Sequence, residues 1–570
     1  MDGILPPGWL TGACLAMMPA VLLLAALPGV KATRGAALAA RRRVRRAALL
    51  ALAGAVLGDL AFGLGARLDL VPVRLPLPGF GFDLPLSIAV NGLTMVLATL
   101  VSFVVAVIAH YSVRYLDGDP QQARFFRLLA FTAAGFLVAV IAGNLGLFTL
   151  AIIATGFSLH RLLAFYGDRP KAVMAAHKKS IFSRTADLLL ALATLSVGQG
   201  VGSLQFDAIA RAAERSGTLP LSLQVAAWLI VGAVILKSAH FPFQGWLIQV
   251  MEAPTPVSAL MHAGVVYSGA IVALRTSPLL VREPEALLFL GAVGLLTIMI
   301  ASLVMTTQTA VKSMLAWSTT AQLGFMSLEL GLGLFPLALM HLVGHSLYKA
   351  HAFLSSGSVT DQLRQVPAAG KETPGPAAWL AMVILGLCIS VAGAWFIGED
   401  PFVGAVPIAL VVIVAVAVSQ ILFKGFQFGG MVERATAVAI ATGMGVLYFL
   451  LHRLFSGWFA PDLAAALEAG GGPGPGPGLG FGLAAAAAVG FLLLGWLQGP
   501  GRARLPERLQ VALYIHLYNG LYVDYWVEQF SHRFWSDKVG VEPRRRNLAL
   551  ESLQSMARNR EVLVESGVVR

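Results

Sequence analysis

The chain has 570 residues, of which 57% are hydrophobic and 12% are charged, and its formal net charge is +12. This composition excludes a soluble globular domain, and the basic residues sit in short connectors rather than on one polar face, which argues against nucleic-acid binding. Apolar blocks of about twenty residues recur along the chain, the length at which a helix crosses the hydrocarbon core. We therefore predict an all-α polytopic membrane protein with about fifteen transmembrane helices.

The predicted spans follow one another with short polar connectors. In chain order they cover residues 9–29, 47–66, 87–112, 126–143, 145–165, 181–203, 221–250, 254–275, 284–305, 310–331, 333–358, 376–397, 402–423, 435–452 and 481–498. The Gly/Pro-rich stretch 470–480 is predicted to be an external linker. Cys14 and Cys388 lie in separate spans, so neither a disulfide framework nor a metal site is expected.

Lysine and arginine gather in every second connector, which sets the predicted orientation. By the positive-inside rule these connectors face the cytoplasm, so in an inner membrane the N-terminus lies outside and the C-terminal tail inside. The basic residues concerned are Lys31, Arg34, Arg41, Arg42, Arg43, Arg45, Arg46, Arg114, Arg124, Arg127, Arg169, Lys171, Lys178, Lys179, Arg364, Lys371, Lys424, Arg502 and Arg504.

The tail from about Leu505 mixes aromatic and charged residues, as an amphipathic helix does. We expect it to lie against the membrane or a partner subunit, because its aromatic side chains need burial. An inert, solvated tail is the alternative.

Ionisable side chains inside the predicted spans are the main functional signal, since a charge in the bilayer core costs several kcal/mol. Lys237 lies in the seventh span, five residues before Pro242. Proline removes a backbone hydrogen bond, so this helix is expected to be kinked or broken there, and the freed carbonyls can attract water. Burial favours the neutral form of an amine, which lets such a lysine exchange its proton.

Further titratable groups follow in later spans. His262 lies about two turns into the eighth span, and Lys312 begins the tenth. His341, His345 and Lys349 are spaced by four residues, so they share one helical face. We predict that these residues and Lys237 form a proton relay, because imidazole takes up and releases protons near neutral pH.

Less specific interpretations remain beside the relay. A membrane histidine is often a packing residue, and a lysine near a helix end can reach the interface, as we expect for Arg275 and Lys424. Metal binding by the histidine pair is less favoured, because no carboxylate or thiol completes a ligand set in the sequence pattern. Arg184 and Asp187 are predicted to form an ion pair, either structural or a lateral gate on Lys237.

These motifs resemble a known family. The stretches 237–247 and 251–263, with the blocks 312–326 and 341–359, resemble the antiporter-like subunits of respiratory complex I and of Mrp antiporters, and the similarity covers roughly residues 90–360. The resemblance implies two inverted five-helix repeats, each with a broken helix, and a proton path at the membrane midplane. It also implies that Lys237 is the central relay lysine, His262 and His345 bridging histidines, Lys312 a further relay lysine and Lys349 the lysine of the second broken helix.

The resemblance also sets the expected domains and the departures from the family. Residues 1–86 would hold N-terminal helices and an external loop, 87–360 the conducting core, 361–500 the remaining helices and 501–570 the tail. The resemblance further places Arg184, Asp187 and Glu252 as charge-pair or gate residues. Ile153 stands where a glutamate in the fifth span would pair with the relay lysine, and residues 395–400 lack an expected lysine. Both losses bring a complete complex I-type channel into question.

The tail around 513–522 looks like that of DabB proteins, a branch that accumulates inorganic carbon. This similarity implies a cytoplasmic DabA-like partner that resembles carbonic anhydrase and carries zinc, while this chain has no cofactor and is not itself an enzyme. The expected role is proton conduction that drives conversion of CO2 to bicarbonate by the partner. The alternatives are a subunit of a redox-driven proton pump, an Mrp-type cation/proton antiporter subunit and a structural membrane anchor.

Overall fold

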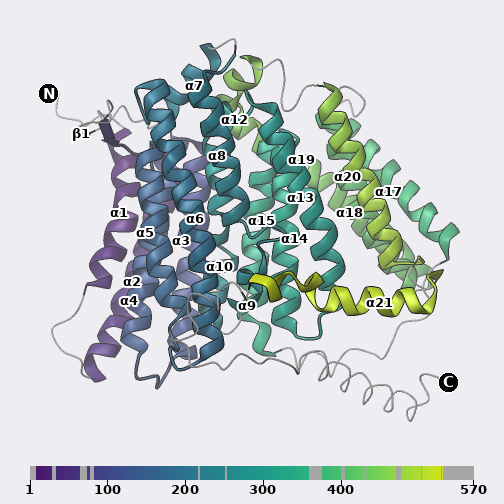
Figure 1. The fold of residues 1–570 in the computed structure, drawn as a ribbon, viewed down its shortest axis with the longest axis horizontal. Coiled ribbons are helices and arrows are strands. Elements are labelled where there is room, and N and C mark those ends of the chain that lie inside the picture. The colour runs from purple at the N-terminus through teal and green to yellow at the C-terminus, as the bar shows by residue number, and fades with distance from the viewer. Residues whose placement is uncertain are drawn as a thin grey trace.

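The computed structural model of the chain describes residues 8–27, 34–64, 73–76, 83–215, 218–250, 253–358, 375–398, 405–428, 430–469, 477–501, 504–527 and 529. Its helices are α1 (Gly8–Ala26), α2 (Arg34–Gly63), α3 (Gly92–Tyr115), α4 (Gln122–Ile141), α5 (Leu145–Leu163), α6 (Pro170–Val201), α7 (Phe206–Arg215), α8 (Leu221–Lys237), α9 (Gly245–Gln249), α10 (Thr255–His262), η2 (Val265–Tyr267), α11 (Ser268–Arg275), α12 (Ser277–Leu280), α13 (Pro284–Met305), α14 (Val311–Gly331), α15 (Phe335–Leu354), η3 (Ser356–Ser358), α17 (Pro376–Phe396), α18 (Ala405–Phe428), α19 (Met431–Ala469), α20 (Pro477–Gln498), α21 (Glu507–Tyr518) and η5 (Gly520–Tyr522). Figure 1 shows long helices running side by side, with α7 and α12 toward one end and α9 and α21 toward the other. We name these the α12 end and the α21 end.

The long helices account for the predicted membrane spans. Among the described residues, eleven helices are long and apolar enough to cross a membrane, and Leu221–Lys237 and Leu410–Phe426 are shorter apolar helices. Helices α14 and α15 run beside them and carry most of the predicted titratable residues. Because helices satisfy their own backbone hydrogen bonds, they suit a lipid environment, and the predicted helical membrane fold is confirmed.

A small sheet was not predicted. Strands β1 (Val73–Pro76) and β2 (Asp83–Leu86) pair antiparallel, with Val73 opposite Leu86. They lie in the connection between α2 and α3, where we expected an external loop. Four-residue strands contain too few residues to give a recognisable alternating pattern in the sequence.

Two helices are interrupted in the middle of the bundle. Helix α8 ends at Lys237, residues 238–244 are not helical, and α9 begins at Gly245. Pro242 follows a cis peptide bond in this gap. A second interruption, at residues 263–267, separates α10 from α11 immediately after His262. Lys349 was expected on a broken helix, but that expectation was wrong, because α15 is continuous from Phe335 to Leu354.

Helices α13 and α14 pack unusually closely, through glycine residues that lack a side chain at the contact. A Cβ atom on Gly294 would meet the backbone of Gly324 and Leu328, and Gly291 lies in the same way against Gly331. Small residues allow helix backbones to approach in a membrane, where packing replaces the hydrophobic effect. This contact holds α14 firmly, and α14 carries several partners of the titratable side chains.

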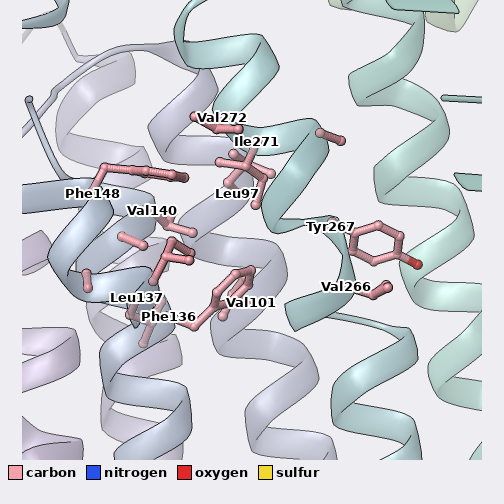
Figure 2. Close-up of a cluster of buried hydrophobic side chains, with 14 of the residues drawn as sticks. Leu97, Val101, Phe136, Leu137, Val140, Phe148, Val266, Tyr267, Ile271 and Val272 are labelled. Carbon is pink, nitrogen blue, oxygen red and sulfur yellow. The ribbon is translucent and has the colours of Figure 1, made fainter. Parts of the chain in front are cut away.

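The apolar core extends from α1 to α15, and a second cluster joins α17–α20 to α13, α14 and α15. Figure 2 shows part of the first cluster, where α3, α4 and α5 pack against η2 and α11. In Figure 2 the ring of Tyr267 lies beside Val266 and apart from the labelled side chains of α3, α4 and α5, and its hydroxyl group points away from them. The α10–α11 interruption therefore packs against apolar side chains, and the hydroxyl group of Tyr267 faces away from them.

The tail crosses the bundle at the α21 end. Helix α21 runs roughly perpendicular to the spans in Figure 1. Tyr514, Tyr518, Tyr522 and Trp526 are all exposed. That this tail is amphipathic and lies against the membrane or a partner subunit stays a prediction. Residues 530–570 and the linker stretch 470–476 lie outside the described residues, while Pro477–Gly480 form the start of α20.

Candidate functional site

The first group of charged side chains surrounds the break in α8. Lys237 is 7% exposed, and its Nζ atom lies 2.6 Å from Oδ1 of Asp187 on α6. The second oxygen of Asp187 lies 3.0 Å from the guanidinium of Arg184, whose charge also lies over the ring of Phe157. The predicted Arg184–Asp187 pair is therefore present, and its carboxylate is shared with Lys237.

Lys179 belongs to this group, although its place in the sequence predicted a position in a connector. It lies inside α6, is 6% exposed, and its Nζ atom is 3.4 Å from the hydroxyl of Ser183. Lys179 and Lys237 line one cavity of about 30 Å³, which is large enough for water. Lys179, Ser183 and Asp187 are spaced by four residues, and this spacing was the available signal.

A contact from the tail closes this group at the α21 end. Lys178 is fully buried, and its Nζ atom lies 3.0 Å from Oδ1 of Asp524, which follows η5. The other oxygen of Asp524 accepts a hydrogen bond from Gln249 of α9 at 2.5 Å. Gly520 lies against the indole of Trp317. We call residues 518–527 the C-terminal strap.

Asp524→Asn is expected to loosen the C-terminal strap. The substitution removes the negative charge that faces Lys178, and an ion pair with a partly exposed carboxylate contributes on the order of 1 kcal/mol, or roughly a fivefold change in opening. Limited proteolysis should therefore cut near Tyr522 and Tyr525 faster than in the parent protein. Glu507→Gln, which removes an exposed charge from α21, is the matched control, and equal cutting of both variants would contradict the anchoring role.

The second group follows the α10–α11 interruption. His262 is fully buried, its Nδ1 atom lies 3.1 Å from the hydroxyl of Thr319, and its ring stacks on Phe353. The hydroxyl of Tyr267 donates to the carbonyl of His262 at 2.8 Å and lies 2.7 Å from Nδ1 of His345. With its proton on the carbonyl, the Tyr267 oxygen accepts from His345. Tyr267, missed in the sequence, thus connects the backbone of His262 to the ring of His345.

His341 and His345 stack along α15 as predicted, with ring centroids 6.0 Å apart. His341 also contacts a buried carboxylate that was not predicted from the sequence. Its Nδ1 atom lies 3.1 Å from Oε2 of Glu329, which is 1% exposed, and its Nε2 atom lies 2.7 Å from Oε1 of Gln322. Glu329 was missed because it is a single acidic residue near the end of a span, where an interfacial position is the ordinary reading.

Lys349 and Lys312 lie nearer the α21 end of the same two helices. Lys349 is fully buried, and its Nζ atom donates to the carbonyl of Leu315 at 3.0 Å. Lys312 is partly buried, with Nζ 3.1 Å from the hydroxyl of Thr255 at the start of α10. At 1.5 Å per residue, His341 and Lys349 are about 12 Å apart along α15. His341, His345 and Lys349 therefore follow one another along the axis of α15.

The structure brings most of the predicted site residues into two neighbouring groups. One contains Lys237, Asp187 and Arg184, and the other contains His341, His345 and Lys349. The backbone carbonyl of His262 is linked to His345 through the hydroxyl of Tyr267. Glu252 lies outside the described residues. Arg275, expected to reach the interface, is 6% exposed and bonds to Thr94 and the carbonyl of Val140, so that expectation was wrong.

The chemistry of these groups suits proton transfer. Within the described part of the chain, the Nε2 atoms of His262 and His345 are buried without a hydrogen-bond partner. A buried ring nitrogen without a protein partner needs a water molecule to complete its hydrogen bonding, and such a water can exchange a proton with it. No group of three or more His, Cys, Asp or Glu side chains that could hold a metal occurs in the described ranges.

Comparison with known proteins gives matches along nearly the whole chain. Residues 142–431 match the family described as NADH:quinone oxidoreductase/Mrp antiporter, transmembrane, and residues 77–126 match the N-terminus of complex I chain 5. The chain is 55% identical over 542 residues to the probable inorganic carbon transporter subunit DabB2 of Halothiobacillus neapolitanus, covering 94% of this chain and 96% of that one. It is 32% identical to the probable inorganic carbon transporter subunit DabB of Hydrogenovibrio crunogenus, over 82% of this chain and 87% of that one.

More distant matches cover less of the relatives. The chain is 33% identical over 313 residues to NADH-quinone oxidoreductase subunit L of Escherichia coli, which is 55% of this chain and 51% of that subunit. A solved structure of the Mrp complex from Dietzia sp. DQ12-45-1b contains a chain of the same fold, with a TM-score of 0.62 and 22% identity. The match covers 98% of this chain and 63% of that longer one.

Proposed function

Because the chain belongs to the NADH:quinone oxidoreductase/Mrp antiporter family of proton-conducting membrane subunits, we propose that it is the membrane subunit of an energy-coupled inorganic carbon pump. The observation that carries this proposal is the 55% identity over 94% of the chain to a protein named as an inorganic carbon transporter subunit. The chain is a transport subunit and not an enzyme. In the proposed mechanism, protons flow inward through it and energise a partner.

The proposed relay uses the residues selected in the sequence. Lys349, His345 and His341 pass protons along α15, Lys312 continues the line toward the α21 end, and His262 lies between this line and Lys237 in the proposed order. Asp187, Arg184 and Glu252 set the charge around Lys237. Burial supports this assignment. An amine in the membrane core costs several kcal/mol of free energy, so buried amines are typical of sites where charge moves through the membrane.

The proposed orientation puts the chain in the inner membrane, with the α21 end in the cytoplasm and the N-terminus outside. The positive connectors support this orientation, because those before α4 and α6 lie at the α21 end. The C-terminal strap would then meet a cytoplasmic, DabA-like zinc subunit that converts CO2 to bicarbonate. A membrane potential of 100 mV supplies about 2.3 kcal/mol per proton, which can hold such a conversion far from equilibrium.

Purification of the intact complex from its native membrane tests the proposal. We expect a soluble zinc subunit to accompany the chain, and bicarbonate accumulation in cells to collapse when a protonophore removes the proton gradient. Co-purification of flavin and iron–sulfur subunits would instead identify a redox-driven pump. Sodium-dependent proton flux in vesicles would identify an Mrp-type antiporter, and either result would overturn the proposal.

A further inference from the structure

The buried carboxylate of Glu329 occupies a position that the relay above does not use. Glu329 lies two residues before the end of α14, at the α12 end of the bundle, and is 1% exposed. Lys312, near the start of the same helix, is seventeen residues away, which corresponds to about 25 Å. Glu329 and Lys312 thus stand at opposite ends of a line that spans most of a 30 Å hydrocarbon core.

The contacts of Glu329 join it to the predicted relay. Both carboxylate oxygens lie close to Nδ1 of His341, at 3.2 and 3.1 Å, and no other described residue forms an ion pair with this carboxylate. Nε2 of His341 faces Oε1 of Gln322 at 2.7 Å. Both ring nitrogens therefore face oxygen acceptors, an arrangement that is satisfied when the ring holds two protons and Glu329 is ionised.

A proton can move between the two groups without leaving a bare charge. When the Nδ1–H bond of the His341 imidazolium breaks and an O–H bond forms on Glu329, a cation and an anion become a neutral imidazole and a neutral acid. In a site of low dielectric constant, desolvation of the two ions opposes the Coulomb attraction between them, which narrows the free-energy gap between the paired ions and the neutral pair. The pair is thus suited to transfer and not only to structural pairing.

Glu329 also has a connection toward the α12 end. His452 of α19 is 8% exposed and interacts electrostatically with Glu329. One helical turn further along α19, the partly exposed Ser456 hydroxyl contacts Nε2 of His452 at 3.5 Å. On the other side of His341, the ring of His345 follows at 6.0 Å.

We propose that Glu329 is the outer proton-carrying group of this chain, which exchanges protons with the α12 side and hands them to His341 and then along α15. The proposal rests on the proposed function, in which the chain conducts protons. It gives the second half of the protein an ionisable outer terminus that residues 395–400 do not provide, since that stretch contains no lysine.

The test compares voltage-driven proton flux in vesicles that contain the purified complex. Glu329→Gln keeps the shape but cannot carry a proton, and we expect at least about a tenfold loss of flux. Glu329→Asp keeps an acid and should retain part of the flux. Glu285→Gln, an exposed glutamate near the start of α13 at the same end, is the matched control and should conduct like the parent protein.

A second measurement separates proton transfer from a structural role. Infrared difference spectra recorded during a change of membrane potential should contain a carboxyl band that shifts in D2O and disappears in Glu329→Gln. This experiment also applies to Glu329→Asp, where the band should move, if the glutamine variant does not assemble. Unchanged flux in Glu329→Gln, or a spectrum without that band in the parent protein, would overturn the inference.

The outcomes also separate this inference from the proposed function. If the parent protein conducts and Lys349→Met does not, while Glu329→Gln conducts normally, only the role of Glu329 is wrong. If the parent protein conducts no protons, the proposed function itself fails.

Discussion

Lys349→Met is expected to lower voltage-driven proton flux by about 100-fold while the complex still assembles. Lys349 is fully buried and donates to a backbone carbonyl, so methionine fills a similar volume without leaving a charged partner behind. What the variant loses is the only amine one turn from His345 on that helical face. The measurement is proton uptake by vesicles that contain the complex, followed with a pH-sensitive dye under an imposed potassium diffusion potential.

Lys424→Met provides the control for this substitution. Lys424 is an exposed lysine of α18, on the α21 side of the bundle like Lys349, and takes no part in the two groups of titratable residues. Its replacement should change flux by less than about twofold, as expected for an exposed charge outside the path. If Lys349→Met conducts protons as well as Lys424→Met does, Lys349 has no role in the proton relay and is only a packing residue.

Asp187→Ala is expected to destabilise the chain by about 3–5 kcal/mol, because it leaves the buried ammonium of Lys237 without its counter-ion. In the double variant Asp187→Ala/Lys237→Met, most of this stability should return, since an apolar pair at a buried site is often as stable as the ion pair. Thermal unfolding of the purified complex in detergent measures both effects. Asp117→Ala, which breaks the exposed Arg41–Asp117 pair, should cost at most about 1 kcal/mol.

The double variant also decides between the two roles left open for the Arg184–Asp187 pair. If the pair is only structural, the stable double variant should conduct protons like the parent protein. If Asp187 and Lys237 act together in the relay, stability should return while flux stays lost. A double variant as unstable as Asp187→Ala would contradict the expectation that the unpaired ammonium of Lys237 causes the loss of stability.

The charge around Lys237 differs from what the family resemblance implied. Ile153 stands where a carboxylate on α5 was expected, and the carboxylate that reaches Lys237 comes instead from α6, at Asp187. Lys179 adds a third buried cation beside Lys237 and Arg184. The loss of a carboxylate on α5 therefore does not leave Lys237 without a counter-ion.

The sequence by itself determined the helical membrane class and the residues that merit testing. Apolar blocks of spanning length predict helices because lipid offers no hydrogen bonds, and lysine or histidine within such blocks stands out for the same energetic reason. Spacing by four residues also placed His341, His345 and Lys349 on one face without any structure. These are local properties, fixed by the period of one helix.

Only the tertiary structure decided which groups meet. Asp187 touches Lys237, Glu329 touches His341, and Asp524 reaches Lys178 across 346 positions of the chain. Tyr267 connects the backbone of His262 to the ring of His345 because the α10–α11 interruption turns its hydroxyl away from the apolar side chains (Figure 2). Such contacts depend on how helices pack and where they break, and the periodicity of a single segment carries no information about the side chains that a neighbouring helix presents.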